Sequence, residues 1–183
     1  MVNALPKKKL REQQINIYNQ LDLANQQKHS LQIQFHLKTF LNHQDFNLMG
    51  SFYPIKNEPN IWPVLAPYKK QLALPVFVKE ECQYQWGPFI SPLSINKFNI
   101  PEPIRTFKTR PKLDICLVPA LGVDPHGNRI GWGYGYFDRL LTEDIPLRIG
   151  IIYNAQRIQS HFKPDKWDIP LTHIISEKGL FVT

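Results

Sequence analysis

Hydrophobic residues recur at helical spacing through the first forty residues of the chain. One repeat runs from Leu10 to Leu21 and a second from Leu31 to Leu41, with Gln, Lys and Asn at most of the positions between. No glycine or proline interrupts residues 7–47. The pattern predicts two helices with a break near residues 25–29, which together form a packing layer.

Beyond residue 43 the pattern changes to short apolar runs bounded by prolines and glycines. A short helix is expected over residues 61–70, extended loop over 88–111, and a helix from Tyr136 to Leu141. Pro75 favours an edge or end position for the strand that contains it. The predicted strands span residues 46–53, 72–78, 83–90, 113–119, 147–153 and 172–176.

The run Leu113–Pro119 is almost continuously apolar, as expected of a central strand that is buried on both faces. Alternation of such strands with helices of crossover length predicts an α/β fold with a mainly parallel sheet flanked by helices in three layers, a Rossmann-like arrangement. The 183 residues suit a single domain, residues 1–183. A hydrophobic content of 43% supports a core and excludes a disordered chain.

Net charge and targeting signals exclude fewer classes of protein than the pattern of hydrophobic residues does. The apolar run 115–123 is far shorter than the ~20 residues of a membrane span, and residues 1–9 lead into no signal-peptide apolar region. Two cysteines are too few for a disulfide framework, so a cytoplasmic location is expected. The net charge of +7 favours nucleic acid, phosphate or polycarboxylate ligands, or is only a basic surface.

The segment 127–139 carries the clearest chemistry. Glycines alternate with aromatic residues over 131–135, after the best strand and before a predicted helix. Glycine allows positive φ, so successive N–H groups can face one concavity beside a helix N-terminus. With Arg129 and Arg139 on either side, the segment is a candidate phosphate cradle, and a tight aromatic-rich hairpin is the alternative.

The spacing matches neither a Walker A loop nor the dinucleotide fingerprint. Asp138, just after the glycines, could hold Mg²⁺ against phosphate oxygens, since magnesium takes one or two carboxylates plus phosphates. It could equally be a first-turn acid that complements the helix dipole. The spacing leaves both possibilities open.

Residues 118–139 as a whole resemble the signature of the 5-formyltetrahydrofolate cyclo-ligase family, also called methenyltetrahydrofolate synthetases. Further elements stand in the family's order, so the resemblance covers nearly the whole chain. These elements are residues 7–11, 52–53, 58–60, 98–103, 154–156 and 167–171.

The resemblance implies ATP- and Mg²⁺-dependent cyclisation of 5-formyltetrahydrofolate to 5,10-methenyltetrahydrofolate, with release of ADP and phosphate. Phosphorylation of the formyl oxygen makes it a leaving group, and N10 then closes the ring. No protein nucleophile is needed, so positioning and charge stabilisation should supply the rate. The implied partners are ATP and a folate that can carry polyglutamate, without nucleic acid or membrane, and a monomer is expected.

The resemblance also implies roles for individual residues. Lys7 and Arg11 would bind ATP from the first helix, and Tyr136 and Arg129 would act at the reacting groups. Asp138 and Asp168 match the family's magnesium carboxylates. The ATP loop would comprise Gly131, Trp132, Gly133, Tyr134, Gly135, Tyr136, Phe137 and Asp138.

For the folate, Glu58 would accept hydrogen bonds from the ring system, while Tyr53 and Phe98 would pack on its rings. Without the resemblance these residues would be a loop acid and core aromatics. Phe98 stands where some relatives carry tryptophan.

The loop departs from the family at Trp132 and Tyr134, where some relatives carry cations, so its ATP contacts should rely on backbone N–H groups. Phe137 replaces a frequent tyrosine. A non-catalytic folate- or nucleotide-binding relative is the first alternative function, and a nucleic-acid-binding protein is the second. The presence of Lys7, Arg11 and the two aspartates favours the enzyme.

Overall fold

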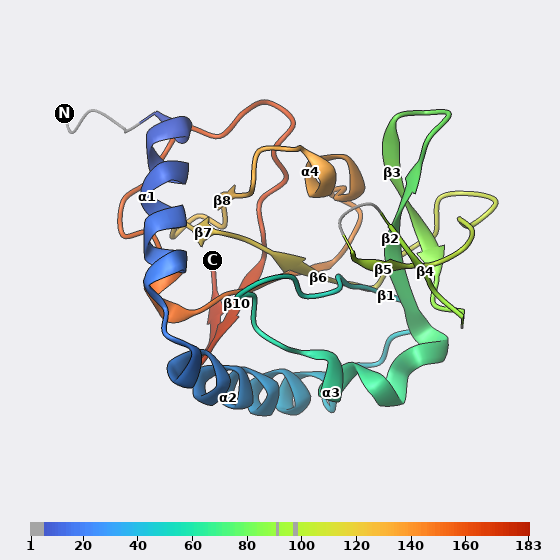
Figure 1. Ribbon diagram of the computed structural model, residues 1–183, viewed down its shortest axis with the longest axis horizontal. Coiled ribbons are helices and arrows are strands. Elements are labelled where there is room, and N and C mark those ends of the chain that lie inside the picture. Colours follow the sequence, from blue (N-terminus) through green and yellow to red (C-terminus); the bar gives the residue numbers. More distant parts are fainter. Residues whose placement is uncertain (1–5, 91, 97–98) are drawn as a thin grey trace.

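A seven-stranded sheet runs through the molecule in the order β11-β10-β9-β6-β1-β2-β3 (Figure 1). The computed structural model describes residues 6–90, 92–96 and 99–183. The strands are β1 (Met49–Gly50), β2 (Leu72–Val78), β3 (Gln83–Pro88), β6 (Ile115–Pro119), β9 (Leu147–Ile151), β10 (His173–Ser176) and β11 (Gly179–Val182).

The five inner strands are parallel, and only the edge strands β3 and β11 run antiparallel to their neighbours. The predicted mainly parallel sheet is therefore confirmed. Strand β6 lies between β1 and β9, and its residues 115–118 are all buried. Its unbroken apolar run follows from this position, because both faces of the strand are covered.

Helices cover both faces of the sheet. On one face Ile33 and Leu37 of α2 (Leu23–Leu41) pack with Leu117 of β6, and α3 (Trp62–Leu65) continues that layer. On the other face Leu140 of α4 (Tyr136–Leu140) packs with Val118. Because successive strand side chains point to opposite faces, β6 contributes to both cores, and the predicted three layers are confirmed.

The first helix, α1 (Lys7–Gln20), lies across the carboxyl ends of the parallel strands. Its Leu10 and Tyr18 pack with Leu121 and Ile130, which lie beyond the end of β6. The chain forms a small hairpin there, β7 (Gly122–Val123) with β8 (Arg129–Ile130), and a turn of 3₁₀ helix, η2 (Asn154–Gln156), follows β9.

The break between α1 and α2 falls at Leu21 and Asp22, so the predicted break at 25–29 is wrong. The Asp22 carboxylate accepts a hydrogen bond of 2.9 Å from the Asn25 backbone N–H, which is an N-cap geometry. Residues 25–29 are polar but helix-compatible, and they form part of the first turns of α2, with residues 25, 27 and 28 exposed. In the sequence, Asp22 is the residue that indicates the start of α2, because aspartate is a preferred N-cap residue.

Several other boundaries differ from the sequence pattern. The strand predicted over 46–53 is reduced to β1, while the helix predicted over 61–70 is α3 followed by the 3₁₀ helix η1 (Ala66–Gln71). The proline-rich segment carries a short hairpin, β4 (Ser94–Ile95) with β5 (Pro101–Glu102), and β11 was not predicted. Pro75 lies in β2 beyond the residues that pair with β1, so its missing N–H interrupts no ladder there.

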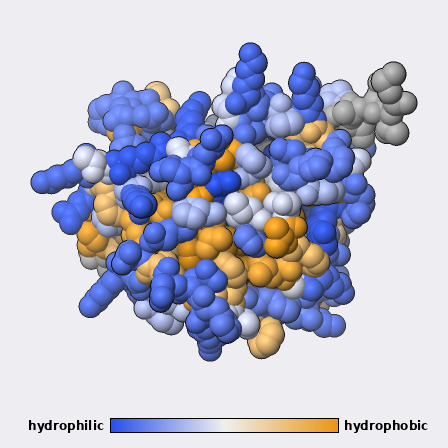
Figure 2. All heavy atoms as spheres, turned by 180° about the vertical axis from the view of Figure 1, so that it is seen from behind, coloured by the Kyte–Doolittle hydropathy of each residue, from blue (hydrophilic) through white to orange (hydrophobic). Residues whose placement is uncertain are grey.

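Seen from behind, hydrophobic residues gather in the middle of one face and hydrophilic residues surround them (Figure 2). Large exposed hydrophobic side chains include Leu31 and Phe35 of α2. Among the described residues no helix has the length and apolar character needed to cross a bilayer. Cys82 and Cys116 are both free.

Candidate functional site

The candidate site lies where the direction of the strand order reverses. From β1 the chain crosses to β2 on one side, whereas β6 lies on the other side of β1 and leads on to β9 and β10. Loops that leave the carboxyl ends of β1 and β6 therefore diverge, and in open α/β sheets ligands bind in the crevice that this divergence creates. The loop after β1 carries Glu58, and the segment after β6 carries the glycines.

A buried aspartate shapes the hairpin that precedes the glycines. The Asp124 carboxylate, 1% exposed, accepts hydrogen bonds of 2.9 Å from the backbone N–H groups of His126 and Asn128. Gly127 in this turn has φ +77°, and a Cβ there would overlap the Leu171 carbonyl oxygen. Only glycine fits this position, and the turn it permits directs β8 back to the site.

The glycine loop is docked on α1 by Arg11. The Arg11 Nε donates a hydrogen bond of 2.8 Å to the Gly131 carbonyl oxygen, and a Cβ at Gly133 would lie 3.4 Å from its Cζ. Gly133 and Gly135 have φ of +97° and +68°. The loop follows the β7–β8 hairpin and enters α4, so it is not the aromatic-rich hairpin considered as the alternative.

Arg129 and Asp138 form an ion pair on the inner side of this loop. The Arg129 side chain is 7% exposed, and burial lowers its pKa while the charges of Asp138 and Asp168 raise it again. A Cβ at Gly131 would lie 2.8 Å from an Arg129 guanidinium nitrogen. The absence of a side chain at Gly131 therefore also makes room for the buried Arg129 guanidinium. The sequence pattern by itself indicates only that Arg129 lies beside the loop.

Lys7 holds Asp168 from the first turn of α1. Its Nζ lies 2.5 Å from the Asp168 carboxylate and 2.9 Å from that of Asp165. The same Asp168 oxygen accepts a hydrogen bond of 2.8 Å from the Asp165 backbone N–H, so this residue is also a turn residue. Asp138 pairs with Arg129, and the charges of both Asp138 and Asp168 raise the pKa of the Arg129 guanidinium.

The carboxylates suit a magnesium ion only together with a ligand. Within the described ranges no group of three or more His, Cys, Asp or Glu side chains could hold a metal. In nucleotide sites Mg²⁺ usually binds one or two carboxylates, and phosphate oxygens and water occupy its remaining coordination positions. The donor set therefore fits Mg²⁺ bound with a nucleotide, and both carboxylates would exchange a cationic side chain for the metal.

Glu58 occupies the loop on the other side of the crevice. It is partly buried, and its carboxylate accepts a hydrogen bond of 3.0 Å from the Ile55 backbone N–H. Burial raises the pKa of Glu58 to about 7, although the Ile55 N–H, hydrogen bonding from Trp132 and the charge of Lys56 lower it. A carboxyl group with this pKa changes charge near neutral pH.

Tyr18 of α1 is a site residue that sequence reasoning missed. It is 1% exposed, its hydroxyl donates to the Ile55 carbonyl at 3.2 Å, and it accepts from the Asn57 N–H at 2.8 Å. Its ring also meets Trp132 edge-on, with ring centroids 5.3 Å apart. A tyrosine on the buried stripe of a helix is usually a core residue, so the sequence position of Tyr18 gives little indication of a role in the site.

Tyr53 begins a row of aromatic rings after β1. Its ring lies 4.8 Å from that of Trp62, which in turn lies 5.7 Å from Phe89. The Trp62 indole nitrogen is buried and has no hydrogen-bond partner among the residues that the structure describes. The rings of this row are tilted by 42° and 44° against one another, and together they offer apolar aromatic surface on which a planar ring can pack. Phe98, the other aromatic residue predicted for the folate, lies outside the described residues.

The remaining loop residues face β3. The Tyr136 ring packs on Tyr84 at 4.3 Å and is stacked with Tyr134 at 5.3 Å, and Tyr134 is 64% exposed. Phe137 packs against Trp86 and lies beneath the Arg129 guanidinium. Phe137 therefore serves the core, and a second hydroxyl at its position would lie among apolar side chains.

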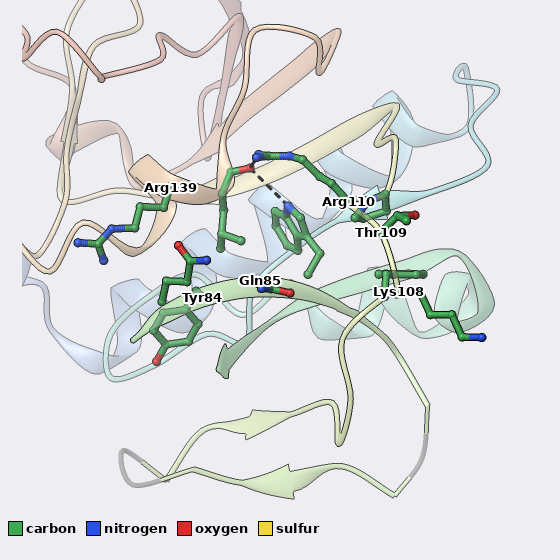
Figure 3. A pocket seen from close by; sticks show the side chains of 11 residues that line it. Tyr84, Gln85, Lys108, Thr109, Arg110 and Arg139 are labelled. Carbon is green, nitrogen blue, oxygen red and sulfur yellow. Dashed lines mark hydrogen bonds between the residues drawn. The ribbon is translucent and has the colours of Figure 1, made fainter. Parts of the chain in front are cut away.

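A cavity of about 330 Å³ adjoins the site between β3 and the end of α4 (Figure 3). Trp86 is one of its lining residues; the indole N–H of Trp86 donates to the Leu140 carbonyl at 3.4 Å, and Arg110 donates to the same oxygen at 2.8 Å. None of the described residues to which the resemblance assigns a role lines this cavity, but Arg139, which was expected beside the phosphate cradle, does. The lining comprises Gln83, Tyr84, Gln85, Trp86, Phe107, Lys108, Thr109, Arg110, Pro111, Arg139 and Leu140.

Comparison with known sequences gives one consistent result. The model of the 5-formyltetrahydrofolate cyclo-ligase family matches residues 4–177. A 5-formyltetrahydrofolate cyclo-ligase from Haemophilus influenzae is 29% identical over 129 residues, which cover 66% of this chain and 63% of that protein. One from Mycoplasma genitalium is 31% identical over 127 residues, covering 61% and 75%. The first of these alignments spans less than two thirds of the relative.

Solved structures agree with the fold. The NMR structure of Aquifex aeolicus 5,10-methenyltetrahydrofolate synthetase superposes with a TM-score of 0.82 at 27% identity, covering 97% of this chain and 93% of that one. A 5,10-methenyltetrahydrofolate synthetase from Mycoplasma pneumoniae superposes with a TM-score of 0.70 at 24% identity, covering 94% and 99%. At that lower identity the second likeness supports the fold alone.

Proposed function

This chain belongs to the 5-formyltetrahydrofolate cyclo-ligase family, and we propose that it converts 5-formyltetrahydrofolate to 5,10-methenyltetrahydrofolate while ATP is cleaved to ADP and phosphate. One observation carries the proposal. Lys7 and Arg11 of α1, the glycine loop, and the carboxylates of Asp138 and Asp168 converge beside the loop that holds Glu58.

The glycine loop would receive the triphosphate. Its backbone N–H groups, with Gly133 and Gly135 at positive φ, supply donors without side chains in the way. Lys7 and Arg11 approach from α1 and offer the cations that Trp132 and Tyr134 do not. Arg129 lies on the inner side of the loop, where a buried guanidinium can stabilise charge on a transferring phosphoryl group.

Asp138 and Asp168 would hold Mg²⁺, which would neutralise phosphate charge and align the γ-phosphate. Their present partners, Arg129 and Lys7, would then be released toward phosphate oxygens. This exchange would keep Asp138, Asp168, Arg129 and Lys7 each next to an opposite charge, and the more exposed Asp165 would lose its contact with Lys7.

The chemistry needs positioning more than a reactive side chain. The formyl oxygen attacks the γ-phosphorus, the bond to the bridging oxygen breaks, and ADP leaves. N10 then attacks the formyl carbon, the carbon–oxygen bond to phosphate breaks, and the N10 proton is lost as the ring closes. Both steps are accelerated when the reactants are held in line and water is excluded.

Glu58 would bind the folate ring system and Tyr53 would pack on it. An ionised Glu58 accepts hydrogen bonds from ring N–H groups, and its partial burial strengthens them. The row formed by Tyr53, Trp62 and Phe89 offers aromatic surface nearby. Tyr136 is retained as a candidate at the reacting groups, at the boundary between the loop and β3.

The decisive experiment is an absorbance assay for the methenyl product with ATP, Mg²⁺ and 5-formyltetrahydrofolate. Absorbance should rise only when all three are present, and ADP should form in equal amount. Absence of product from folded protein would contradict the proposal, and binding of both ligands without product would indicate the non-catalytic relative.

The metal role can be tested with Asp168→Asn, which keeps an acceptor for the Asp165 N–H. It should lose turnover and raise the Mg²⁺ concentration needed for half-maximal rate. Asp138→Asn should do the same, but it leaves the buried Arg129 with a neutral partner, so its fold must be checked by circular dichroism. Unchanged magnesium dependence in both folded variants would exclude these ligands.

A further inference from the structure

The cavity between β3 and the end of α4 is basic, and no step of the proposed reaction uses it (Figure 3). Lys108, Arg110 and Arg139 line it, and all three residues are exposed. None of the three forms an ion pair with another residue that the structure describes. The cavity therefore presents positive charges that the folded chain leaves open to an anion.

The Glu81 carboxylate lies near this cavity but does not line it. It accepts hydrogen bonds from the side chains of Gln83 and Gln85, the second at 2.7 Å. Both glutamines are lining residues, and no acidic side chain is found among the described residues that line the cavity. One carboxylate outside the lining does not offset the three cations inside it, so the cavity favours an anionic ligand over a neutral one.

The cations are spread along the cavity. Figure 3 shows Arg139 beside Tyr84 at one end and Lys108 beyond Thr109 at the other, with Arg110 between them. The Arg110 guanidinium is held there by its hydrogen bond of 2.8 Å to the Leu140 carbonyl. A compact anion needs cations gathered at one point, whereas a chain of carboxylates can meet guanidinium and ammonium groups one after another. The spacing therefore favours an extended polycarboxylate.

This cavity also reaches the glycine loop. Tyr84 is a lining residue, and its ring packs on that of Tyr136 at 4.3 Å. A Cβ at Gly135 would lie 4.0 Å from the Arg139 Cζ, so the Arg139 guanidinium lies close to both the loop and the cavity. A ligand in the crevice that extends past Tyr136 and Arg139 would enter the cavity.

We propose that this cavity is a second anion site, separate from the glycine loop, and that it binds a chain of carboxylate groups. Two sources have this chemistry: further glutamate residues linked to a folate that is bound in the crevice, and a free polycarboxylate. The contact between the cavity and the glycine loop favours the first source. For that source alone the inference rests on the proposed function, since the cavity and its charges do not depend on it.

Calorimetry with three ligands distinguishes the sources. The ligands are 5-formyltetrahydrofolate with one glutamate, the same compound with three γ-linked glutamates, and a free γ-linked triglutamate peptide. The triglutamyl folate should bind at least about fivefold more tightly than the monoglutamyl form, because linkage raises the local concentration of the added carboxylates. This gain should shrink toward one at about 1 M salt, which screens exposed charges.

The residues are tested by a matched pair of charge reversals. Lys108→Glu changes a lining residue, and Lys112→Glu makes the same change at an exposed lysine that does not line the cavity. The gain from added glutamates should fall about threefold or more in Lys108→Glu and stay within about 1.5-fold in Lys112→Glu. Affinity for the monoglutamyl form should be the same in both. Lys108→Gln, which only removes the charge, should give a smaller loss in the same direction.

Each outcome has a separate meaning. If the free peptide binds in a way that depends on Lys108 while the triglutamyl folate gains nothing, the anion site is supported and the folate-linked source is wrong. Equal affinities of Lys108→Glu and Lys112→Glu for both the peptide and the triglutamyl folate would overturn the site itself. If neither folate binds to the folded protein, the proposed function fails, and the peptide titration still decides whether the cavity binds carboxylates.

Discussion

Replacement of Glu58 by glutamine should stabilise the fold at alkaline pH and change it much less near pH 5. Burial raises the pKa of this carboxyl group from 4.5 to about 7, so between these values the folded state binds more protons than the unfolded state. The free energy of unfolding then falls as pH rises through this window. Glutamine does not titrate, and it therefore removes this part of the pH dependence.

The magnitude follows from the two pKa values. At about 1.36 kcal/mol for each pH unit between them, ionised Glu58 costs roughly 3 kcal/mol above pH 7. From pH 5 to pH 8 the variant should therefore gain about 2–3 kcal/mol relative to the unchanged protein. For a chain of this size that corresponds to about 5–10 °C in Tm.

The assay is urea unfolding of both proteins at several pH values between 5 and 8, without ligands. Glu80→Gln, at an exposed acid, is the control and should show a constant difference from the unchanged protein. A difference for Glu58→Gln that stays constant within about 0.5 kcal/mol over this range would refute the reasoning, because it would mean that folding leaves the carboxyl group solvated.

Three further predictions concern the frame of the site. Gly127→Ala should lower the free energy of unfolding by about 3 kcal/mol or more, because it combines a positive φ with overlap on a backbone carbonyl; a urea midpoint within error of the unchanged protein would contradict this. Tyr18→Phe should lower the free energy of unfolding by about 1–3 kcal/mol, because a partly buried N–H in the loop that carries Glu58 loses its acceptor. Urea unfolding should show this loss and the KM for folate should rise with it; if neither quantity changes, other contacts hold the loop. Lys7→Met should weaken ATP binding at least about tenfold by calorimetry, since it removes a charge-assisted contact to phosphate; exposed Lys163→Met is the control, and equal affinities for ATP in the two variants would exclude the role of Lys7.

Much of the fold could be predicted from the spacing of hydrophobic residues, because a buried strand produces a simple run of apolar side chains. The run at 113–119 could be assigned to the middle of the sheet because only a strand covered on both faces tolerates continuous apolar residues. The break between the first helices lies at Asp22 and not at residues 25–29, because the Asp22 carboxylate caps α2 and the polar residues after it are compatible with a helix. Strand β11 was missed because its alternation is carried by only four residues at an edge.

The candidate site was only partly predictable, because the local spacing of residues does not show which residues far apart in the sequence come into contact. The glycine segment and Asp138 could be found from their order after the best strand. That Arg129 would be buried against Asp138 depends on space left at Gly131, and the contact of Lys7 with Asp168 joins opposite ends of the chain. Trp132 was assigned by its place in the loop, whereas its contacts lie across the crevice.

The position of α1 also has a consequence for the time at which the site can form. Lys7 and Asp168 are 161 residues apart, and Arg11 and the Gly131 carbonyl are 120 apart. During synthesis α1 leaves the ribosome more than a hundred residues before these partners, so its basic side chains stay unpaired until the partners have been made. Closure of such long loops is slow compared with helix formation. The crevice should therefore be the last part of the protein to become ordered during synthesis, after the inner strands have already assembled.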